Sequence, residues 1–275
     1  MKIQYYGTAA YEGIPSLFCQ CETCRIARER GGKNIRTRAQ ALIDDKILID
    51  FGPDTVAHNL RFAPDWNRIT HCLITHSHSD HFYPEDAEMS GPGYAAGIRT
   101  KLHYYADRAA YDRLAASFDN HPERFAETAD ATRVTVGEPF SFDGYTVLAV
   151  RANHAPDTTP VVYALTDGKK RMLYAHDTGL LSDESKATLA IFGRFDFVSL
   201  DCTGAFKPGW VNGHMCLETC LGVVKEMKET GMADDRTIFV VNHFSHNGGA
   251  LHEEMEQAMA PHGILVAYDG MTVEF

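Results

Sequence analysis

The feature that most constrains this chain is the sequence THSHSDH at residues 75–81, which follows a short apolar segment typical of a strand. It contains His76, His78, Asp80 and His81. On a loop after a strand, side chains at this spacing can converge on one point, whereas a helix would separate them. Imidazole and carboxylate are ligands of zinc, manganese and iron. Because the chain has only 14 histidines in 275 residues, three within six positions indicate a metal site.

The motif H-x-H-x-D-H is the hallmark of the metallo-β-lactamase superfamily, and the chain resembles that superfamily over most of its length. The other segments that carry the resemblance, in the family's order, are Leu48-Ile49-Asp50-Phe51-Gly52, Ala152-Asn153-His154, Asp177-Thr178-Gly179 and Val240-Val241-Asn242-His243. Taken alone, an Asp-Thr-Gly is often a turn or a helix cap, and a histidine at a strand end is often a core residue. Their order behind the histidine cluster makes the resemblance strong.

The resemblance implies a centre of two divalent metal ions, Zn or Mn. The ligands that it implies are His76, His78 and His154 for the first ion, Asp80, His81 and His243 for the second, and Asp177 as the bridge between them. A hydroxide shared by the two ions would be the nucleophile, because bound metals lower the pKa of water.

Two neighbours of these ligands have their own interpretations. Asp50 is either an acid that orients a ligand histidine or a turn residue before Gly52. His176 stands beside Asp177 on a predicted strand, so alternation directs its ring to the opposite face. We leave His176 out of the ligand set.

A second group of potential ligands is CQCETC at residues 19–24. Three of the seven cysteines lie there, and such bunching with an odd total favours metal over disulfides in a reducing compartment. The C-x-C-x2-C spacing brings three thiolates onto one tight loop, where a cation would offset their repulsion. Scattered cysteines would instead be small core residues. A closed zinc site needs a fourth ligand.

The resemblance supplies that ligand. In the phosphoribosyl cyclic phosphodiesterases, the phosphonate-utilisation branch of the superfamily, an early C-x-C-x2-C is completed by a histidine shortly after the last catalytic one. The similarity to this branch includes Gly7-Thr8 and the basic stretch behind the cysteines. An alternative fourth ligand is His252. The structural zinc site that it implies consists of Cys19, Cys21, Cys24 and His246. The cysteines expected in the core are Cys72, Cys202, Cys216 and Cys220.

Hydrophobic periodicity predicts the fold class α/β, a four-layer αββα sandwich of two mixed β-sheets, as one domain over residues 1–275. The predicted strands are 2–6, 39–44, 46–51, 70–75, 101–105, 133–136, 139–143, 145–151, 161–166, 171–175, 195–200, 237–242, 264–268 and 271–275. The predicted helices are 21–30, 54–60, 106–117, 180–192, 214–230 and 250–260.

Charge and hydropathy restrict the partners. The formal net charge of −11 argues against nucleic acid, because a polyanion would be repelled, and favours a small anionic substrate. The basic residues of 25–38 form either a solvated helix face and loop or a patch that attracts a small anion. No apolar run approaches the roughly 18 residues of a membrane span, and the N-terminus lacks the apolar core of a secretory signal. We therefore expect a cytoplasmic protein without a membrane partner, and analogy with the relatives suggests a homodimer.

The predicted function is a binuclear metal-dependent hydrolase, most similar to a phosphodiesterase, that acts on a small phosphodiester, cyclic or open. We assign catalysis to Asp80, as a ligand of the second ion, and to His214 at the start of the predicted helix 214–230. In the phosphodiesterase branches, a histidine at a comparable place contacts the phosphoryl oxygen or protonates the leaving alkoxide, and helix N–H groups suit an anion. The alternative role of His214 is to cap the helix or to pack.

Three other functions stay open at this point. They are hydrolysis of a lactone, amide or thioester, an iron-dependent oxidoreductase, and a non-catalytic cofactor-pathway protein of the same fold. The complete ligand set argues against the non-catalytic function. Iron proteins of this fold can carry Glu at the position of His78, so the histidine here favours zinc or manganese. Residues 84–94 exceed the corresponding connection in the phosphodiesterase relatives, so we expect extra loop material beside the site.

Overall fold

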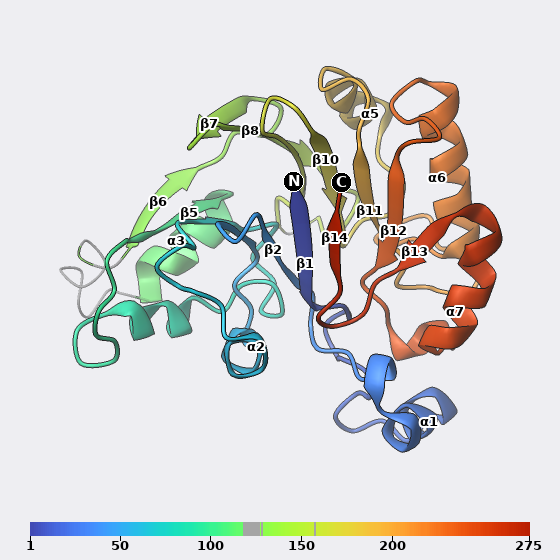
Figure 1. Cartoon of the computed structure of the whole chain (residues 1–275), viewed down its shortest axis with the longest axis horizontal. Helices are drawn as coiled ribbons and strands as arrows, with labels where there is room; N and C mark the ends of the chain where they lie inside the picture. The colour runs from blue at the N-terminus through green and yellow to red at the C-terminus, as the bar shows by residue number, and fades with distance from the viewer. Residues whose placement is uncertain (118–126, 128, 157) are drawn as a thin grey trace.

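The structure is a computed structural model that describes residues 1–117, 127, 129–156 and 158–275. In this part of the chain the strands form two seven-stranded sheets (Figure 1). The first sheet, in the order β14-β1-β2-β3-β4-β5-β6, consists of β1 (Lys2–Gly7), β2 (Gln40–Ile43), β3 (Ile47–Ile49), β4 (His71–Leu73), β5 (Leu102–Ala106), β6 (Ala129–Arg133) and β14 (Thr272–Glu274). The second sheet, in the order β13-β12-β11-β10-β9-β8-β7, consists of β7 (Pro139–Phe142), β8 (Tyr145–Arg151), β9 (Val161–Thr166), β10 (Arg171–Ala175), β11 (Phe197–Asp201), β12 (Ile238–Asn242) and β13 (Ile264–Val266).

Both sheets are mixed. Strands β14, β1, β2 and β3 pair antiparallel, whereas β3 to β6 pair parallel. In the second sheet β7 to β10 pair antiparallel and β10 to β13 pair parallel. The helices are α1 (Glu22–Arg30), α2 (Thr55–Phe62), α3 (Arg108–Ser117), α5 (Asp183–Ala190), α6 (Leu217–Glu229) and α7 (His252–Met259), with short 3-10 segments η1 (Gly32–Asn34), η2 (Pro84–Ser90), η3 (His246–Gly248) and η4 (Ala260–His262).

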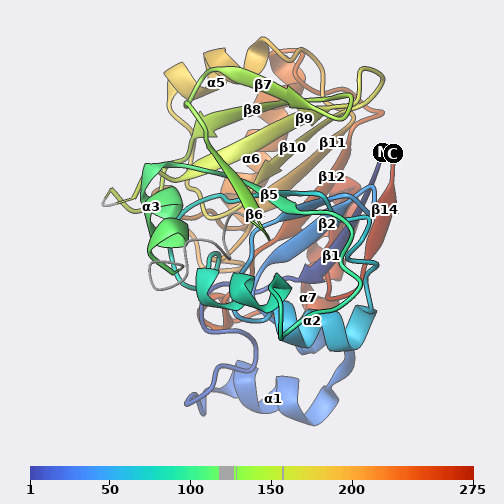
Figure 2. The same ribbon diagram turned by 90° about the vertical axis from the view of Figure 1, so that its left-hand side faces the viewer.

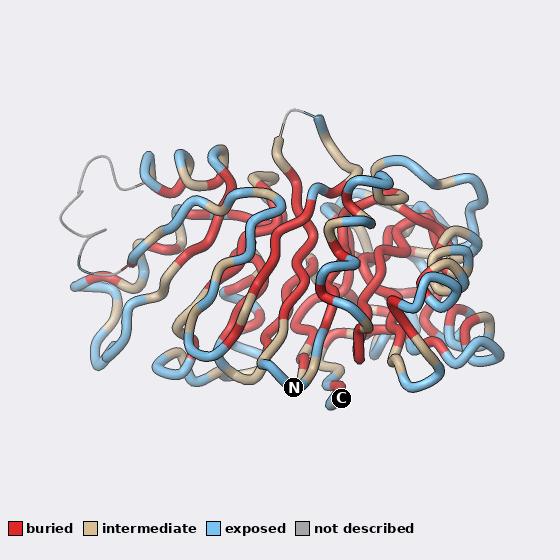
Figure 3. The backbone as a smooth tube through the Cα atoms, turned by 90° about the horizontal axis from the view of Figure 1, so that it is seen from above, coloured by how far each residue is buried: buried red, intermediate tan, exposed pale blue. Residues whose placement is uncertain are grey.

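Alternation along the strands divides the core into layers. In β10, Met172 and Tyr174 pack into the cluster between the two sheets, whereas Leu173 and Ala175 face the cluster beneath α5, α6 and α7. A third cluster joins the outer face of the first sheet to α2 and α3. Figures 1 and 2 show helices on both outer faces, with α1 at one end of the molecule, and Figure 3 shows the buried backbone concentrated in the strands. The predicted αββα architecture of two mixed sheets is confirmed.

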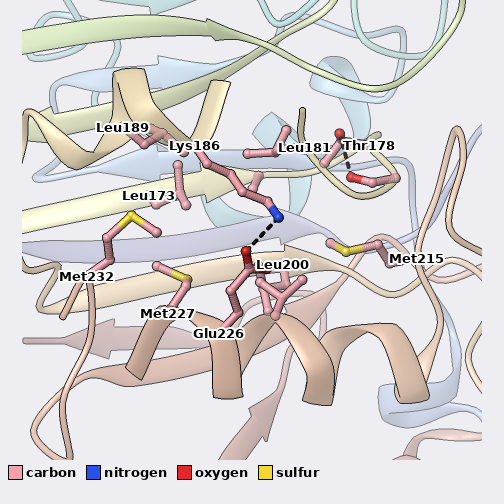
Figure 4. A pocket seen from close by; sticks show the side chains of 13 residues that line it. Leu173, Thr178, Leu181, Lys186, Leu189, Leu200, Met215, Glu226, Met227 and Met232 are labelled. Atoms are coloured by element: carbon pink, nitrogen blue, oxygen red, sulfur yellow. Dashed lines mark hydrogen bonds and ion pairs between the residues drawn. The ribbon is translucent and has the colours of Figure 1, made fainter. Parts of the chain in front are cut away.

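A small cavity of about 40 Å³ remains between the second sheet and helices α5 and α6. Figure 4 shows apolar side chains around it, among them Leu173, Leu189 and Met227. Lys186 on α5 reaches across to Glu226 on α6 at 2.6 Å and closes one side. The cavity is a packing defect in the apolar layer.

The predicted elements agree with the structure to within a few residues at most boundaries. The predicted strand 133–136 lies earlier, at Ala129–Arg133. The long helix begins at Leu217 and not at residue 214, because Cys216 has an extended backbone and serves as its N-cap. None of the helices in the described residues has the length and apolar character needed to cross a membrane.

Candidate metal centre

Potential ligands converge at one edge of the molecule, where strands of both sheets end. The residues that follow strand ends there are Asp50 after β3, His76 after β4, His154 after β8, Asp177 after β10 and His243 after β12. His78, Asp80 and His81 extend from the same loop as His76. Segments that are distant in the sequence therefore contribute to one site.

The first cluster contains His76, His78, His154 and Asp177, whose ligand atoms all lie within 4.8 Å of one another. The Nε2 atom of His76 is 2.9 Å from Nδ1 of His78, and Nε2 of His154 is 3.4 Å from the same atom. A neutral imidazole carries one proton, so nitrogens that face each other in this way keep unused lone pairs. A cation between them would satisfy those lone pairs.

The second cluster contains Asp80, His81, Asp177 and His243, all of them buried. Nε2 of His81 lies 3.2 Å from Asp80 Oδ2, 3.0 Å from Asp177 Oδ2 and 3.4 Å from Nε2 of His243. Two carboxylates and two imidazoles in a buried pocket are a donor set that suits a divalent cation.

Asp177 belongs to both clusters. Its Oδ2 faces His76 and His81, and its Oδ1 lies 3.4 Å from His154 Nε2. Within the described residues this buried Oδ1 accepts no hydrogen bond. An ionised, buried oxygen that accepts no hydrogen bond is costly unless positive charge lies beside it. The shared carboxylate and the donor atoms around it therefore fit a pair of metal ions.

The ring nitrogens that point away from the clusters are held by neighbouring groups. Asp50 lies 2.7 Å from Nδ1 of His81 and also accepts hydrogen bonds from Thr75. Thr203 lies 2.9 Å from Nδ1 of His243. Nδ1 of His154 is 3.1 Å from the Gly213 carbonyl, to which it can donate. Such contacts fix the tautomer and leave the inner nitrogen free to bind a metal.

The backbone is strained at three of these positions. Asp50, Asp177 and His243 have φ values of 66°, 53° and 64°, a region that non-glycine residues seldom occupy. Each follows the end of a strand, so the left-handed turn redirects its side chain to the common edge. Strain of this kind persists where the surrounding structure fixes it, and it clusters at functional sites.

Electrostatics keep the acids ionised. Burial would raise the pKa of Asp177, but His243, His76 and His81 hold that pKa well below its usual range. For Asp80, burial is likewise outweighed by His81, and its pKa is lowered to about 2. Burial lowers the pKa of His154 to about 4. The clusters thus offer anionic carboxylates and at least one neutral imidazole, the forms that bind cations.

His214 lies beside the clusters, on the loop that precedes α6. Its Nδ1 is 3.1 Å from Asp201 Oδ2 and 3.2 Å from Asp177 Oδ1. Burial opposes its charged form, but the hydrogen bond with Asp201 outweighs burial and raises the pKa of His214 to about 9. The expectation that His214 starts the helix, with the helix N–H groups beside it, was wrong, since it lies three positions before Leu217, where the helix begins.

Asp201 was missed by the sequence reasoning. It is fully buried at the end of β11, and its Oδ1 accepts hydrogen bonds from the backbone N–H groups of Thr203 and Met215. Its Oδ2 faces His214 and lies 3.4 Å from Nδ1 of His243. An acid directly at the end of an apolar strand was the signal that could have found it.

The clusters open into a cavity of about 440 Å³. Its lining includes Tyr11, Glu12, Trp210, Ser245 and Asn247, together with residues of both clusters and His214. None of the described lining residues comes from 84–94, so the expectation that this segment lies beside the site was wrong. It instead lines a separate cavity of about 310 Å³ against α2.

The three cysteines of the N-terminal region meet a histidine from the far end of the chain. Cys19 Sγ and Cys21 Sγ each lie 3.5 Å from Nδ1 of His246, and Cys24 completes the group within 4.8 Å. Burial alone would raise the pKa of Cys21. Hydrogen bonds to its sulfur, of which the one from the Cys24 backbone is the strongest, outweigh burial and lower the pKa to about 6. His252 lies elsewhere, between Arg36 and Glu256.

The basic stretch behind the cysteines is engaged within the protein. The contacts are Arg25 with Glu29, Arg28 with the carbonyls of Ser16 and Cys19, Arg30 with Glu253, Lys33 with Glu256, Arg36 with Thr8, Ala267 and His252, and Arg38 with Asp54. These partners favour the interpretation as a helix face and loop over that of an anion-attracting patch.

His176 is buried, and its Nε2 is paired with Ser199 at 2.7 Å.

The comparisons with known proteins agree with this architecture. Residues 45–243, more than half of the chain, match the family described as the beta-lactamase superfamily domain. The chain belongs to this superfamily, which confirms the resemblance seen in the sequence.

Individual relatives are more distant. Ribonuclease Z of Staphylococcus aureus is 24% identical over 178 residues, which cover 59% of this chain and 52% of the relative, so the chain spans about half the length of the curated relatives it matches. A diphosphatase from the PhnP family is similar in structure with a TM-score of 0.74 and 24% identity, covering 100% of this chain and 97% of the other. Zn²⁺-bound PqqB from Methylobacterium extorquens has a TM-score of 0.75 and 18% identity, covering 100% of both chains. At these identities the structural similarity shows the fold.

Proposed function

We propose that the chain is a hydrolase of small phosphodiesters that uses two divalent metal ions, zinc or manganese. The proposed ligands are His76, His78 and His154 for one ion, Asp80, His81 and His243 for the other, and Asp177 for both. Asp177 carries the proposal, because it is shared by the two clusters and its buried Oδ1 has no hydrogen-bond partner in the described part of the chain. Two such ions are typical of enzymes that displace phosphoryl oxygens.

The chemistry divides between the ions and the chain. When bound, the ions supply an acidified water and positive charge for the phosphoryl oxygens. Asp50 and Thr203 orient His81 and His243 so that their inner nitrogens point into the second cluster.

His214 is proposed to donate the proton to the leaving oxygen. Asp201 occupies its Nδ1, which leaves Nε2 to carry the transferable proton. The ring lines the same cavity as Asp80 and Asp177, within reach of a bound phosphoryl group. A positioned acid of this kind contributes about 10²- to 10⁴-fold to a rate.

The first test uses the purified protein with added manganese or zinc and bis(p-nitrophenyl) phosphate. We expect turnover by the wild type, and a fall in kcat of about 10²-fold or more in His214→Ala with a smaller change in KM. His262→Ala, at an exposed histidine, is the matched control and should keep full activity. A protein that carries its metals but leaves every phosphodiester intact would refute the proposal, and a parallel panel of esters, lactones and thioesters would then identify the bond.

The relatives named ribonuclease Z make RNA the competing substrate. The cavity lining favours a small substrate, because Glu12, Asp80 and Asp177 contribute carboxylates to it and no described lining residue is Lys or Arg. Structured RNA should therefore be cleaved far more slowly than a small phosphodiester at physiological salt. Faster cleavage of RNA would reverse this assignment.

We also propose that Cys19, Cys21, Cys24 and His246 hold one structural zinc ion. The Cys3His set has the composition of a closed zinc site, and its atoms already lie within 4.8 Å of one another. Nε2 of His246 faces Glu12 at 3.6 Å, the kind of outer contact that orients a metal-binding histidine. Elemental analysis should find three metal ions per chain, and two would remove the cysteine site from the proposal.

A further inference from the structure

The cavity of about 310 Å³ on the outer face of the first sheet has no part in the proposed hydrolysis. It shares no described lining residue with the metal cavity. Side chains of α2, of η2 and of the segment 95–100 surround it, and its volume lies in the range of small-molecule sites. The lining residues that also belong to the apolar cluster outside the first sheet include Phe51, Ile69, Leu102 and Tyr104.

Contacts within the protein hold the walls of this cavity. The Phe51 N–H donates to the His81 carbonyl at 2.9 Å, and the Phe51 and Tyr104 rings meet edge to face with their centroids 5.9 Å apart. On another side, Trp66 Nε1 donates to Asn59 Oδ1 at 2.8 Å. A cavity whose walls are already fixed can take up a ligand without the cost of ordering them.

The opening of the cavity is apolar as well. Val56, Met89 and Ile98 line it, and their exposed fractions are 42%, 47% and 44%. Exposed apolar side chains gathered around a hollow indicate a binding surface. The body of a ligand that fits here is therefore apolar.

One charge lies in this apolar lining. Asp86 is the only charged residue of the described lining, and among the described residues its carboxylate neither accepts a hydrogen bond nor pairs with a cation. Burial, with the Glu85 charge adding to it, raises the pKa of Asp86. This carboxylate has thus lost solvent without gaining a positive partner. It would repel a fatty acid or a phosphate, whereas an ammonium group would supply the missing charge.

From this arrangement we propose a second binding site, for a small organic ammonium ion. The apolar body of the ligand lies against the rings of Phe51 and Trp66 and the side chain of Met89. Its nitrogen donates a hydrogen bond to the Asp86 carboxylate. The site is independent of the metal clusters and takes no part in bond cleavage.

Calorimetric titration with two matched probes tests this site. The probes are 4-phenylbutylamine, which is a cation at pH 7, and 4-phenylbutanol, which has the same apolar body and no charge. The protein is used in its metal-loaded form, so that the acids of the metal cavity do not compete for the amine. We expect both probes to bind, and the amine to bind about fivefold more tightly than the alcohol.

Two pairs of variants locate the binding. Asp86→Asn should weaken the amine to the level of the alcohol and leave the alcohol within about twofold, whereas Glu85→Gln, at an exposed acid outside the lining, should change neither. Ala95→Phe adds a ring within the lining and should weaken both probes by about tenfold. Ala96→Phe, at the next residue and outside the lining, is its matched control and should leave both unchanged. The unfolding temperature of each variant shows that it is folded.

Three results would overturn the proposal, and each would leave the phosphodiesterase proposal standing. Equal affinity of the wild type for the two probes, or an unchanged preference for the amine in Asp86→Asn, would show that the cavity does not recognise a cation. Absence of binding by both probes would show that the cavity is no small-molecule site. Wild-type affinity for the amine in a folded Ala95→Phe variant would place its binding elsewhere.

Discussion

Substitution of Gly179 by alanine should displace the loop that carries His214. A Cβ atom at this position would lie 2.3 Å from the Val211 carbonyl oxygen and 2.7 Å from Asn212 Cα. Ordinary contact begins near 3.4 Å, so the backbone of residues 211–213 must retreat by about 1 Å. Neither obstacle is the flexible end of a side chain. The movement would stretch the hydrogen bond from Leu180 N–H to the Val211 carbonyl, which is now 2.8 Å long.

Two consequences follow from this displacement. Overpacking against backbone typically costs about 1–3 kcal/mol of stability. A catalytic group that is misplaced by about 1 Å typically loses about 10²-fold in rate. Gly179→Ala should therefore lower the free energy of unfolding by about 1–3 kcal/mol and reduce kcat toward bis(p-nitrophenyl) phosphate by about 10²-fold. The ligand atoms of both clusters lie outside the loop, but its Gly213 carbonyl orients His154, so any loss of metal should be confined to the first cluster.

Urea denaturation, steady-state kinetics and elemental analysis measure these three quantities. Gly222→Ala is the matched control, because Gly222 lies within α6 and a Cβ there would meet nothing within 4 Å. That change should leave kcat intact and stabilise the protein by up to about 1 kcal/mol through helix propensity. Wild-type kcat and stability in Gly179→Ala would show that the close approach of the loop does not position His214.

Three further changes have defined outcomes. Val223→Ile adds a methylene toward the cavity of about 40 Å³ and should stabilise the protein by about 0.5–1 kcal/mol in urea denaturation. Asp201→Asn removes the charge that faces His214 and should reduce kcat about 10- to 100-fold, with both metal ions retained by elemental analysis. Burial lowers the pKa of His58 to about 4 in the folded protein. As the pH falls, His58 is therefore protonated in the unfolded chain before it is protonated in the folded one. Stability that is present above pH ~6.5 should therefore decline by about 2 kcal/mol between pH 7 and 5 in urea titrations, and His58→Gln should remove that part of the slope.

Sequence reasoning succeeded where the signal was local. The hairpin of β2 and β3 is a case, since the predicted strands 39–44 and 46–51 do pair antiparallel, and Asp44 and Asp45 have positive φ in the turn between Ile43 and Ile47. The histidine loop was likewise recognised as a cluster of potential ligands, because these residues lie within six positions and follow an apolar strand. Both features depend on neighbours in the chain and not on tertiary packing.

The errors concern residues whose roles depend on tertiary contacts. Asp201 is a single acid at a strand end, and only the fold brings it to His214. The start of α6 was misplaced because hydrophobic periodicity does not locate a cap, and Cys216 is an uncommon N-cap. The position expected for residues 84–94 was wrong. A segment that follows the histidine loop in the sequence can still cover either face of the sheet. Here η2 packs with α3 on the outer face of the first sheet.

The proposed zinc site leads to a prediction about the coupling of the two metal-binding regions. His246 follows His243 by three residues, so a metal held by the cysteines would fix the segment that presents a ligand of the second cluster. This segment is otherwise tied down by the hydrogen bonds of Phe244 with Thr8 and Ala10. Loss of the zinc should thus loosen the strand end without removing any ligand of the catalytic pair.

Cys24→Ser tests that coupling, because Cys24 is fully buried and serine is a much weaker zinc ligand. We expect two metal ions per chain instead of three, a lower unfolding temperature and a reduced kcat. Cys216→Ser is the matched control: this buried cysteine caps α6, serine is a preferred N-cap, and all three ions should remain. If Cys24→Ser kept three ions, the cysteine loop would not be a metal site. If it lost one ion without any change in unfolding temperature or kcat, the metal would be bound there without bracing His243.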